Sequence, residues 1–409
     1  MRRPRVLVLD ESPFVPTNNG KRIRTRNLIS RLARCHRIEI VAYEDEEAGI
    51  GEGSSSHGVD WSLVPRPAFA KFGLRAGFAA LRASLRGEPY SCVPFTRPEF
   101  RRLVAERIRE FDPDLIHVEL TPVAASLPES CRIPVVIGTH NFEAMIWKRL
   151  ASAERSLVLR FGYWIQHRCM LEFERRQIGS ATAVTAVSHI DRGLLQELSG
   201  NPRIEVVPNG IDPAFYEIDA HCSEPDTIGF IGALDWRPTI DAVHHFVDHV
   251  FPRVRAKRPG AQLIVAGRRP QVDLAARLDA LPDVELIADV PDMRDVLRRI
   301  AVSVVPIRVG SGSRIKILES MAAGCPVVST SIGAEGLDVE DGVELLLADD
   351  AERFAENVAR VLESRQMARD LANRGRRFVE DNHAWDRIVD RLDHVWATAL
   401  GTKTGHEGG

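Results

Sequence analysis

One segment near the carboxyl end of the chain restricts the fold most, because its pattern is that of a complete β-α-β unit. A short apolar run at 302–306 predicts a strand of the kind that parallel sheets bury. Two closely spaced glycines then predict a tight loop, and a helix is expected to begin near Ser311 or Ser313. Gly324 is a signal for the helix end, and the next strand is expected at 327–330. The segment predicts an α/β fold.

The loop of this unit has the features of an anion-binding site. Free backbone N–H groups and the positive end of a helix dipole point at one place after such a loop. Lys316 adds positive charge, and Glu319 follows on the same helix face, which suits a nucleotide with phosphates at the loop and sugar hydroxyls at Glu319. An ordinary β-α-β unit with solvated charges explains the same spacing. The residues expected in the cradle are Gly310, Ser311, Gly312, Ser313, Arg314, Lys316 and Glu319.

The sequence Gly-Ser-Gly-Ser-Arg-Ile-Lys-Ile-Leu-Glu at 310–319 resembles the donor-binding segment of GT-B glycosyltransferases of family 4, which retain the anomeric configuration. Members of that family usually carry a pair of glutamates here. The second glutamate corresponds to Glu319, but Ser311 stands at the position of the first, which in the family lies close to the transferred sugar. The segment 310–330 and its continuation at 331–337 are similar to a subgroup that has a lysine in the helix. The resemblance extends over nearly the whole chain.

Bulk composition excludes several classes of protein. A chain of 409 residues is more often two domains than one, and a net charge of −3 gives no indication of nucleic-acid binding. No apolar run approaches the length of about 18 residues needed for a membrane span. The start of the chain lacks the pattern of a signal peptide, and six scattered cysteines without a C-x-x-C pair indicate reduced thiols and no metal site. A cytoplasmic location is therefore expected.

Residues 1–208 are expected to form the first of two Rossmann-like domains. Its strands are predicted at 5–10, 38–42, 114–118, 134–139, 181–187 and 204–208. Helices are predicted at 21–34 and, as one long element, at 144–177. In the family the loop after the first strand faces the donor diphosphate, and Asn19 and Gly20 stand where members often have two glycines. A simple loop is the alternative interpretation of these two residues.

Two histidines follow predicted strands of this domain. A lone histidine is more often structural, but the carboxyl edge of a parallel sheet is where α/β sites form. In the family, a histidine after the corresponding strand contacts the transferred sugar and the reacting centre. His140 matches that position best, with Glu143 one turn away, and His117 is the second candidate.

A basic stretch at 66–109 has ten Lys or Arg residues against three Glu, interleaved with aromatic and leucine residues. Such a stretch could lie on an anionic membrane surface, which would place the protein peripherally at the inner membrane face. It could equally be a helix whose charges are solvated and whose apolar side lies in the core. The resemblance adds weight to the membrane interpretation because many related enzymes act on lipid-linked acceptors.

Residues 209–384 are expected to form the second domain, after a Val-Pro-Asn-Gly-Ile-Asp turn at 207–212 that resembles the interdomain linker of the family. Its other strands are predicted at 227–231, 262–266 and 284–287. In the family an arginine and a lysine bind the diphosphate, and Ala233 occupies the usual arginine position here. Arg237, Arg268 and Arg314 are the arginines that could replace it, and the backbone at Val290 is expected to receive the base. A helix at 385–400 should return to the first domain, before a disordered tail at 401–409.

The sequence therefore predicts an α/β protein with two Rossmann-like domains facing across a cleft. By resemblance it is a retaining, metal-independent glycosyltransferase without a cofactor. Its substrates would be a nucleotide-sugar donor and a glycan or lipid-linked acceptor, and its catalytic residues His140, Lys316 and Glu319. A nucleotide-sugar epimerase of the same fold and a non-catalytic, nucleotide-sugar-binding partner subunit are the alternatives. A dinucleotide oxidoreductase is disfavoured because no G-x-G-x-x-G motif follows the first strand of either domain.

Overall fold

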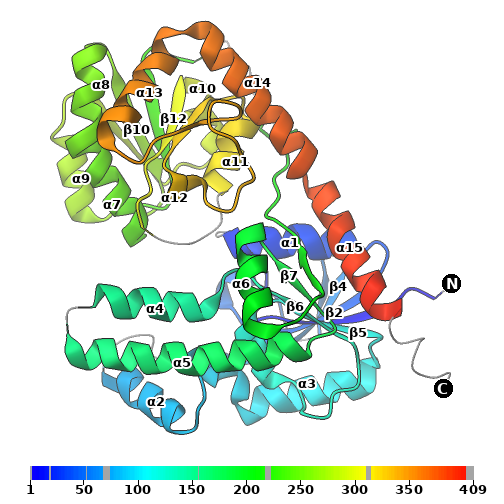
Figure 1. Ribbon diagram of the computed structural model, residues 1–409. Coiled ribbons are helices and arrows are strands. Elements are labelled where there is room, and N and C mark those ends of the chain that lie inside the picture. Colours follow the sequence, from blue (N-terminus) through cyan, green and yellow to red (C-terminus); the bar gives the residue numbers. More distant parts are fainter. Residues whose placement is uncertain are drawn as a thin grey trace. The chain divides into compact units, whose positions relative to one another are not determined.

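The computed structural model describes residues 2–17, 20–51, 53–67, 74–154, 156–216, 223–309 and 315–401. The chain divides into two compact units. Unit 1 consists of Met1–Pro208 and Ile388–Gly409, and unit 2 of Asn209–Arg387. The boundary near the carboxyl end falls within the last helix, α15 (Trp385–Gly401), which is drawn in red in Figure 1.

Unit 1 is built on an eight-stranded sheet with the order β3-β4-β2-β1-β5-β6-β7-β8. Its strands are β1 (Arg5–Leu9), β2 (Arg37–Tyr43), β3 (Ser55–Ser56), β4 (Val59–Val64), β5 (Leu115–Val118), β6 (Val135–Gly138), β7 (Ala183–Ala186) and β8 (Ile204–Val206). The pairing of β3 with β4 is antiparallel and the other pairings are parallel. Strand order reverses between β1 and β5, so their carboxyl ends form the switch point at which open α/β sheets bind ligands.

The helices of unit 1 cover both faces of this sheet, with α1 and α3 on opposite faces (Figure 1). They are α1 (Gly20–Leu32), α2 (Leu74–Leu85), α3 (Pro98–Phe111), α4 (Glu143–Ala153), α5 (Leu157–Ser180) and α6 (His189–Ser199). Helix α3 follows Arg97, has Pro98 at its first position, and buries Phe100, Val104 and Phe111 against the sheet. Strand β1 carries the continuous apolar run that predicted it, and in the equally buried β5 only His117 interrupts the run.

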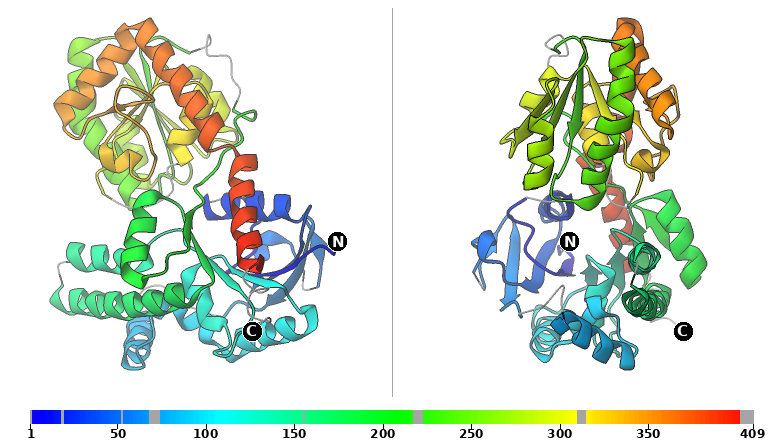
Figure 2. Two further views of the ribbon diagram at one scale, coloured as in Figure 1. Left: turned by 45° about the vertical axis from the view of Figure 1, so that its right-hand side comes forward. Right: turned by 90° about the vertical axis from the view of Figure 1, so that its left-hand side faces the viewer.

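The prediction of one long helix at 144–177 was wrong, because the structure has two helices, α4 and α5, packed against each other as a hairpin (Figure 2). The chain leaves the helical conformation at Glu154, which has extended backbone angles. The Glu154 side chain accepts a hydrogen bond of 2.9 Å from the backbone N–H of Ser156, the residue that precedes α5. This local side-chain bond competes with helix continuation, although the residues around it have good helix propensity.

Unit 2 is built on a six-stranded parallel sheet with the order β11-β10-β9-β12-β13-β14. Its strands are β9 (Thr227–Ile231), β10 (Gln262–Gly267), β11 (Val284–Ala288), β12 (Val302–Val305), β13 (Val327–Ser329) and β14 (Leu346–Leu347). Strand order reverses between β9 and β12, which defines the switch point of this unit. The predicted strand at 227–231 is confirmed residue for residue.

The helices of unit 2 are α7 (Arg237–His245), α8 (Phe251–Lys257), α9 (Val272–Asp279), α10 (Met293–Arg299), α11 (Ile315–Ala322), α12 (Ser331–Ala334), α13 (Ala351–Glu363) and α14 (Arg365–Asn382). A π-helical turn at Phe246–Val250 joins α7 to α8. Pro252, in the first turn of α8, has no N–H to donate, which explains why the hydrogen-bond pattern changes there. Helix α11 is followed by Gly324 at φ +69°, as the sequence signal predicted.

The carboxyl-terminal part of α15 belongs to unit 1 and is held there by buried contacts. Trp396 is fully buried, and its ring centroid lies 5.4 Å from that of His117 and 5.3 Å from that of His36. His36 Nε2 lies 2.6 Å from a carboxylate oxygen of Asp393 on the same helix. Among the helices that the structure describes, none has the length and apolar character needed to cross a bilayer.

Candidate active site

The switch point of unit 1 holds a cluster of buried charged side chains from β1, β5 and α1. Asp10 directly follows β1, and Glu119 directly follows β5, so both carboxylates lie at the same edge of the sheet. Both side chains are almost completely buried. Buried charges need partners, and α1, which begins beside this edge, supplies two of them, Lys21 and Thr25.

Asp10 forms an ion pair with Lys21, whose ammonium group also lies 3.2 Å from a carboxylate oxygen of Glu11. Burial by itself lowers the pKa of Lys21, but the attraction of Asp10 and Glu11 outweighs that effect and raises it. Burial also raises the pKa of Asp10, and the charge of Lys21 partly offsets this effect. The ion pair fixes the start of α1 against the end of β1.

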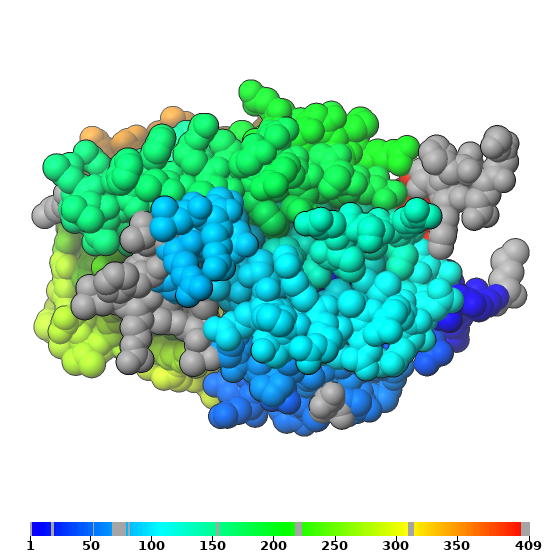
Figure 3. Space-filling model, turned by 90° about the horizontal axis from the view of Figure 1, so that it is seen from below, coloured from blue at the N-terminus to red at the C-terminus, as the bar shows by residue number. Residues whose placement is uncertain are grey.

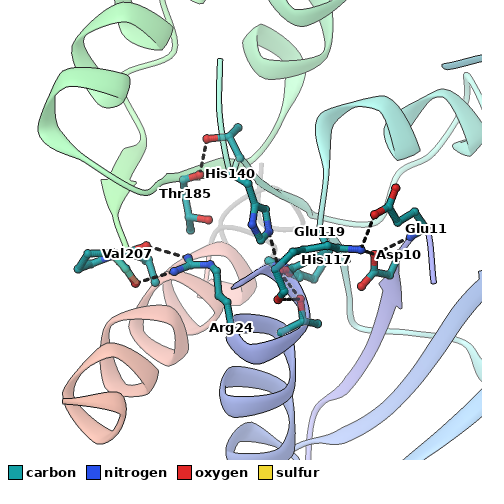
Figure 4. Close-up of polar contacts among 12 residues, drawn as sticks. Asp10, Glu11, Arg24, His117, Glu119, His140, Thr185 and Val207 are labelled. Carbon is teal, nitrogen blue, oxygen red and sulfur yellow. Dashed lines mark hydrogen bonds and ion pairs between the residues drawn. The ribbon is translucent and has the colours of Figure 1, made fainter. Parts of the chain in front are cut away.

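Glu119 uses both of its carboxylate oxygens. Oε1 accepts hydrogen bonds of 2.9 Å from His140 Nε2 and from the Thr25 hydroxyl, and Oε2 accepts one of 2.9 Å from His117 Nε2 (Figure 4). Burial opposes ionisation of Glu119, but the hydrogen bonds from the two histidines hold its pKa well below the usual value. Glu119 is therefore the ionised centre of this site.

The partners of the two histidines fix their orientation. The indole N–H of Trp396 on α15 donates to His117 Nδ1 at 3.3 Å, so the other ring nitrogen of His117 carries the proton that Glu119 accepts. Glu119 binds the Nε2 side of His140 in the same way, so Nδ1 of His140 is the ring nitrogen that this carboxylate does not engage. This carboxylate–imidazole pair positions His140, whereas His117 is buried in the sheet and serves the carboxylate.

Arg24, on α1, links this site to the last residues of unit 1. The guanidinium of Arg24 is buried and donates to the carbonyl oxygens of Val207 at 2.7 Å and Pro208 at 2.5 Å (Figure 4). Burial lowers the pKa of Arg24 to about 10, and the nearby charge of Glu119 opposes this. Helix α1 thus contacts both the carboxylate cluster and the last residues before unit 2.

Two further glutamates meet at the start of α4: Glu143, its first residue, and Glu174 from the neighbouring helix α5. The carboxylate of Glu174, on α5, accepts hydrogen bonds from the backbone N–H groups of Glu143 at 3.0 Å and Ala144 at 2.9 Å. It therefore caps α4 from a neighbouring helix. Burial raises the pKa of Glu174 to about 8 and that of Glu143 to about 7, with a smaller contribution to the latter from Glu11. Glu143 is thus a carboxyl group that titrates near neutral pH close to His140.

The switch point of unit 2 is built differently, around Gly232 and Lys316. Gly232 follows β9, and a Cβ placed on it would lie 2.9 Å from Nζ of Lys316 on α11. The same ammonium lies 5.1 Å from the centroid of the Phe230 ring, a cation–π distance. A Cβ on Gly267, at the end of β10, would lie 1.7 Å from the Gly232 carbonyl oxygen. A Cβ at position 267 would therefore collide with the backbone of the neighbouring strand end, whereas one at position 232 would displace the flexible end of Lys316.

Glu319 lies one turn after Lys316 on α11 and is half-buried. Its Oε1 accepts a hydrogen bond of 2.8 Å from the Tyr216 hydroxyl. Burial raises the pKa of Glu319, and both the Tyr216 hydrogen bond and the charge of Lys316 partly offset this. Burial also raises the pKa of Tyr216, and the neighbouring carboxylate adds to the effect. One carboxylate oxygen is thus held by Tyr216, and the other is oriented by that bond.

The remaining predicted donor-binding residues follow strand ends or begin helices. Gly20 is the first residue of α1, and Arg237 is exposed at the start of α7. Arg268 directly follows β10, where its carbonyl oxygen accepts from the N–H of Leu234, and Val290 lies in the loop after β11. The predicted residues Asn19, Gly310, Ser311, Gly312, Ser313 and Arg314 lie outside the described residues. Among residues with described positions, no group of three or more His, Cys, Asp or Glu side chains could hold a metal ion.

Sequence reasoning missed the residues that support these sites: Lys21, Thr25, Glu119 and Tyr216. Glu119 could have been found, because a carboxylate directly after a predicted buried strand is a signal for the active edge of a parallel sheet. Lys21 and Thr25 share one face of α1 by i, i+4 spacing, but nothing local shows which strand end that face contacts. Tyr216 has no sequence signal of this kind.

Comparison with known families assigns both units. The model "Glycosyltransferase Family 4" matches residues 18–215, and "Glycosyl transferases group 1" matches residues 225–364. The chain belongs to the family 4-like glycosyltransferases. It is 25% identical to the phosphatidyl-myo-inositol mannosyltransferase of Mycolicibacterium smegmatis over 74% of this chain and 76% of that protein. It is 26% identical to a GDP-mannose-dependent alpha-(1-6)-phosphatidylinositol monomannoside mannosyltransferase of Mycobacterium tuberculosis over 60% of this chain and 70% of that protein.

Solved structures confirm the GT-B fold of this glycosyltransferase. Sucrose-phosphate synthase from Thermosynechococcus elongatus superimposes with a TM-score of 0.73 at 15% identity, covering 98% of this chain and all of that one. WaaG, a glycosyltransferase involved in lipopolysaccharide biosynthesis, gives 0.64 at 15% identity, covering 95% and 99% of the two chains. HepE of Anabaena, in complex with UDP and glucose, gives 0.63 at 15% identity, covering 96% and 99%. The prediction of an α/β chain with two Rossmann-like domains is thereby confirmed.

Proposed function

We propose that this glycosyltransferase moves a hexosyl residue from a nucleotide-sugar donor to a glycan or lipid-linked acceptor, with retention of configuration and without a metal ion. The observation that carries the proposal is the position of the Lys316 ammonium at the switch point of unit 2, against a glycine that leaves room for it. A cation at the carboxyl edge of a parallel sheet, beside a helix start, is suited to a diphosphate.

In this proposal Lys316 binds the donor diphosphate, together with the glycine-rich residues 310–314, Arg237 and Arg268. Glu319 accepts hydrogen bonds from the ribose hydroxyls through the oxygen that Tyr216 does not occupy. The backbone at Val290 receives the base. Gly20, the first residue of α1, contacts the donor from unit 1, together with Asn19, which precedes it in the sequence.

The diphosphate is the leaving group, so negative charge develops on it as the glycosidic bond breaks. A preorganised cation at that position stabilises the transition state, typically by about 3–4 kcal/mol for one such group. Lys316 supplies this stabilisation and no covalent nucleophile is required, since in front-face substitution the leaving phosphate takes the acceptor proton. His140, held by Glu119, contacts the transferred sugar through its Nδ1 side.

The identity of the relatives supports a glycolipid or polysaccharide acceptor. The mannosyltransferases of the two mycobacterial species are named for phosphatidylinositol-based substrates, and WaaG for lipopolysaccharide biosynthesis. HepE was solved with UDP and glucose, which supports a nucleoside diphosphate sugar as the donor class.

A thermal-shift screen against UDP-, GDP-, ADP- and TDP-sugars tests the proposal. A donor that binds only the folded protein raises the melting temperature, and a ligand at about 100 times its Kd stabilises by roughly 2.7 kcal/mol. We expect one nucleotide class to give a shift that Lys316→Ala abolishes. Absence of a shift with all four classes, or the same shift in the variant, would contradict the role given to Lys316.

A further inference from the structure

The tip of the α4–α5 hairpin is the most exposed apolar region that the structure describes. Residues 156–162 are all exposed, so the first two turns of α5 have no buried face. Val158 is 81% exposed, Leu157 69% and Phe161 62%. A helix that covers a protein core buries one face, so this pattern marks a surface prepared for contact with something else.

Aromatic side chains extend the apolar surface away from the tip. The rings of Phe161 and Trp164 are stacked, with centroids 6.0 Å apart and an angle of 15° between their planes. Together with residues of α4 they line a groove of about 670 Å³ between the two helices. Half-exposed Trp and Phe side chains beside basic residues are typical of surfaces that lie at the membrane interface.

The described residues of this tip carry positive charge that no described acidic side chain pairs with. Lys148, Arg149, Arg160 and Arg168 are all exposed, and no ion pair links any of them to the residues that the structure describes. Lys148 and Arg160 line the groove itself. The single acidic residue described between α4 residue 144 and α5 residue 171 is Glu154, whose carboxylate is bound to the N–H of Ser156.

At the opposite end of α5, exposed arginines do form ion pairs. There Arg175 and Arg176 are equally exposed, but both lie against Glu172, at 2.8 Å and 3.5 Å. On α3, the guanidinium of Arg101 also has a partner, because it donates to the carbonyl oxygen of Ala125 at 2.8 Å. Positive charge without a described ion pair, next to exposed apolar side chains, thus characterises the tip and not the other end of α5.

We propose that the tip, formed by residues 148–154 and 156–164, docks unit 1 onto an anionic lipid bilayer. Leu157, Val158 and Phe161 would enter the interface, while Lys148 and Arg160 would bind lipid phosphates and Trp164 would lie at headgroup level. The occupant is an anionic bilayer, and not a second protein, because Lys148 and Arg160 line the groove together with the apolar residues and form no ion pair with a described residue. Helix α2, part of the basic stretch at 66–109, packs beside α5 on this side of unit 1 through Gln166, whose side chain donates to Ala80 and Ser84 (Figure 3).

Sedimentation of the full-length protein with vesicles tests the proposal. Vesicles of phosphatidylcholine alone are compared with vesicles that also contain phosphatidylglycerol. We expect binding to the anionic vesicles, weakening as salt is raised. Lys148→Gln and Arg160→Gln should each lower the partition coefficient roughly fivefold, the value of one basic residue near an anionic surface. Leu157→Ser with Val158→Ser removes apolar side chains without changing charge and should also lower it by at least tenfold.

Arg175→Gln with Arg176→Gln is the matched control, because it removes two exposed charges from the same helix at its other end. Equal loss of binding in this control and in the tip variants, or no binding of the unaltered protein, would overturn the proposal. Mass measurement in solution distinguishes the other occupant: a dimer that Leu157→Ser with Val158→Ser dissociates would show that a second copy covers the tip.

Tryptophan fluorescence tests the proposal on the unaltered protein, without removing charges or apolar side chains from the tip. On anionic vesicles Trp164 should be quenched by brominated lipids, and Trp164→Phe should remove that quenched component. Unquenched Trp164 in vesicle-bound protein would also overturn the proposal. Because neither experiment uses a donor or an acceptor, failure here would leave the proposed glycosyl transfer standing.

Discussion

The switch points of the two sheets have the same topology but are lined by different residues: charged and polar side chains in unit 1, and glycines with one lysine in unit 2. In unit 1 the edge is filled by side chains that satisfy one another: Asp10 with Lys21, and Glu119 with His117, His140 and Thr25. In unit 2 the corresponding edge is cleared by Gly232 and Gly267, and Lys316 reaches into the space that a side chain at position 232 would occupy.

The difference shows how one fold can supply two kinds of surface. A fully hydrogen-bonded polar network is rigid, because any movement would leave a buried charge without its partner. Such an edge is suited to presenting one group, His140, in a fixed orientation. An edge lined by glycine can admit a ligand close to the backbone, with a lysine as the charge that meets it. We call the first edge the wall edge, because its side chains are held by one another. We call the second the receptor edge, because the proposed function places the donor diphosphate at Lys316.

The largest effect should come from the receptor edge. Lys316→Ala removes the cation that stabilises the leaving diphosphate and should lower kcat by about 10²–10³-fold, the usual cost of losing one preorganised charge-stabilising group. The rate of sugar transfer, measured with the donor found in the thermal-shift screen, checks this. Lys257→Ala, at an exposed lysine of the same unit, should leave the rate unchanged.

The wall edge should show its largest effect in stability. Glu119→Gln replaces an ionised carboxylate that accepts from two histidines and a threonine, and should reduce the free energy of unfolding by about 2–3 kcal/mol, measured by denaturant titration. The effect should also depend on pH, because folding lowers the pKa of Glu119. Its stabilising contribution is present above the unfolded pKa of about 4.3 and is lost as pH falls through the folded value. The difference in unfolding free energy between the unaltered protein and Glu119→Gln should therefore shrink below about pH 4. A constant difference down to pH 2 would show that its ionised form does not stabilise unit 1. Glu197→Gln, at an exposed glutamate, is the control.

A smaller effect should come from Gly232→Ala, which fills the space beside the Lys316 ammonium without removing its charge. Gly232→Ala keeps Lys316 but places a Cβ 2.9 Å from its Nζ, so the ammonium must shift. We expect donor affinity to fall about tenfold, equivalent to about 1.4 kcal/mol, with little change in melting temperature. Calorimetric titration of the donor measures it. Gly260→Ala, where a Cβ would meet its nearest neighbour at 3.8 Å, should bind donor normally. Normal affinity of Gly232→Ala would mean that the diphosphate does not meet Lys316 at this position.

The smallest effect should come from Tyr216→Phe, which removes one hydrogen bond to Glu319. The loss should be about 1 kcal/mol, seen as a severalfold rise in KM for the donor with kcat nearly unchanged. If the tyrosine acts by orienting Glu319, the change should vanish when Glu319 is already replaced by Gln, as in a double-mutant cycle. Additive effects of the two substitutions would show that Tyr216 acts separately.

Sequence alone predicted most of the fold because its signals are local. The strand at 227–231 is a buried apolar run bounded by polar residues and a glycine, and the end of α11 is marked by Gly324. The break between α4 and α5 was missed because it depends on one side-chain hydrogen bond at Glu154. Strand β4 was missed although its sequence carries a signal, since Val59, Trp61 and Leu63 alternate with Asp60 and Ser62 as in a half-buried strand.

Less of the candidate active site than of the fold could be predicted, because its residues are recognisable only where they follow a predicted strand or begin a predicted helix. Positions at strand ends are readable, so His140 and Lys316 could be placed at the carboxyl edges of two sheets. Their partners come from distant parts of the chain: Tyr216 bonds to Glu319 across 103 residues, and Trp396 to His117 across 279. Such contacts arise from tertiary packing, so no local pattern predicts them.

One measurement tests most directly whether unit 2 binds the nucleotide while unit 1 supplies the sugar-contacting histidine. It is calorimetric titration of the free nucleoside diphosphate into Lys316→Ala and into His140→Ala. The account predicts that Lys316→Ala loses most of this binding. It predicts that His140→Ala keeps it at the level of the unaltered protein, although sugar transfer is lost. Equal loss of nucleotide binding in both variants, or loss in His140→Ala alone, would contradict the assignment of the nucleotide to unit 2 and of the sugar-contacting histidine to unit 1.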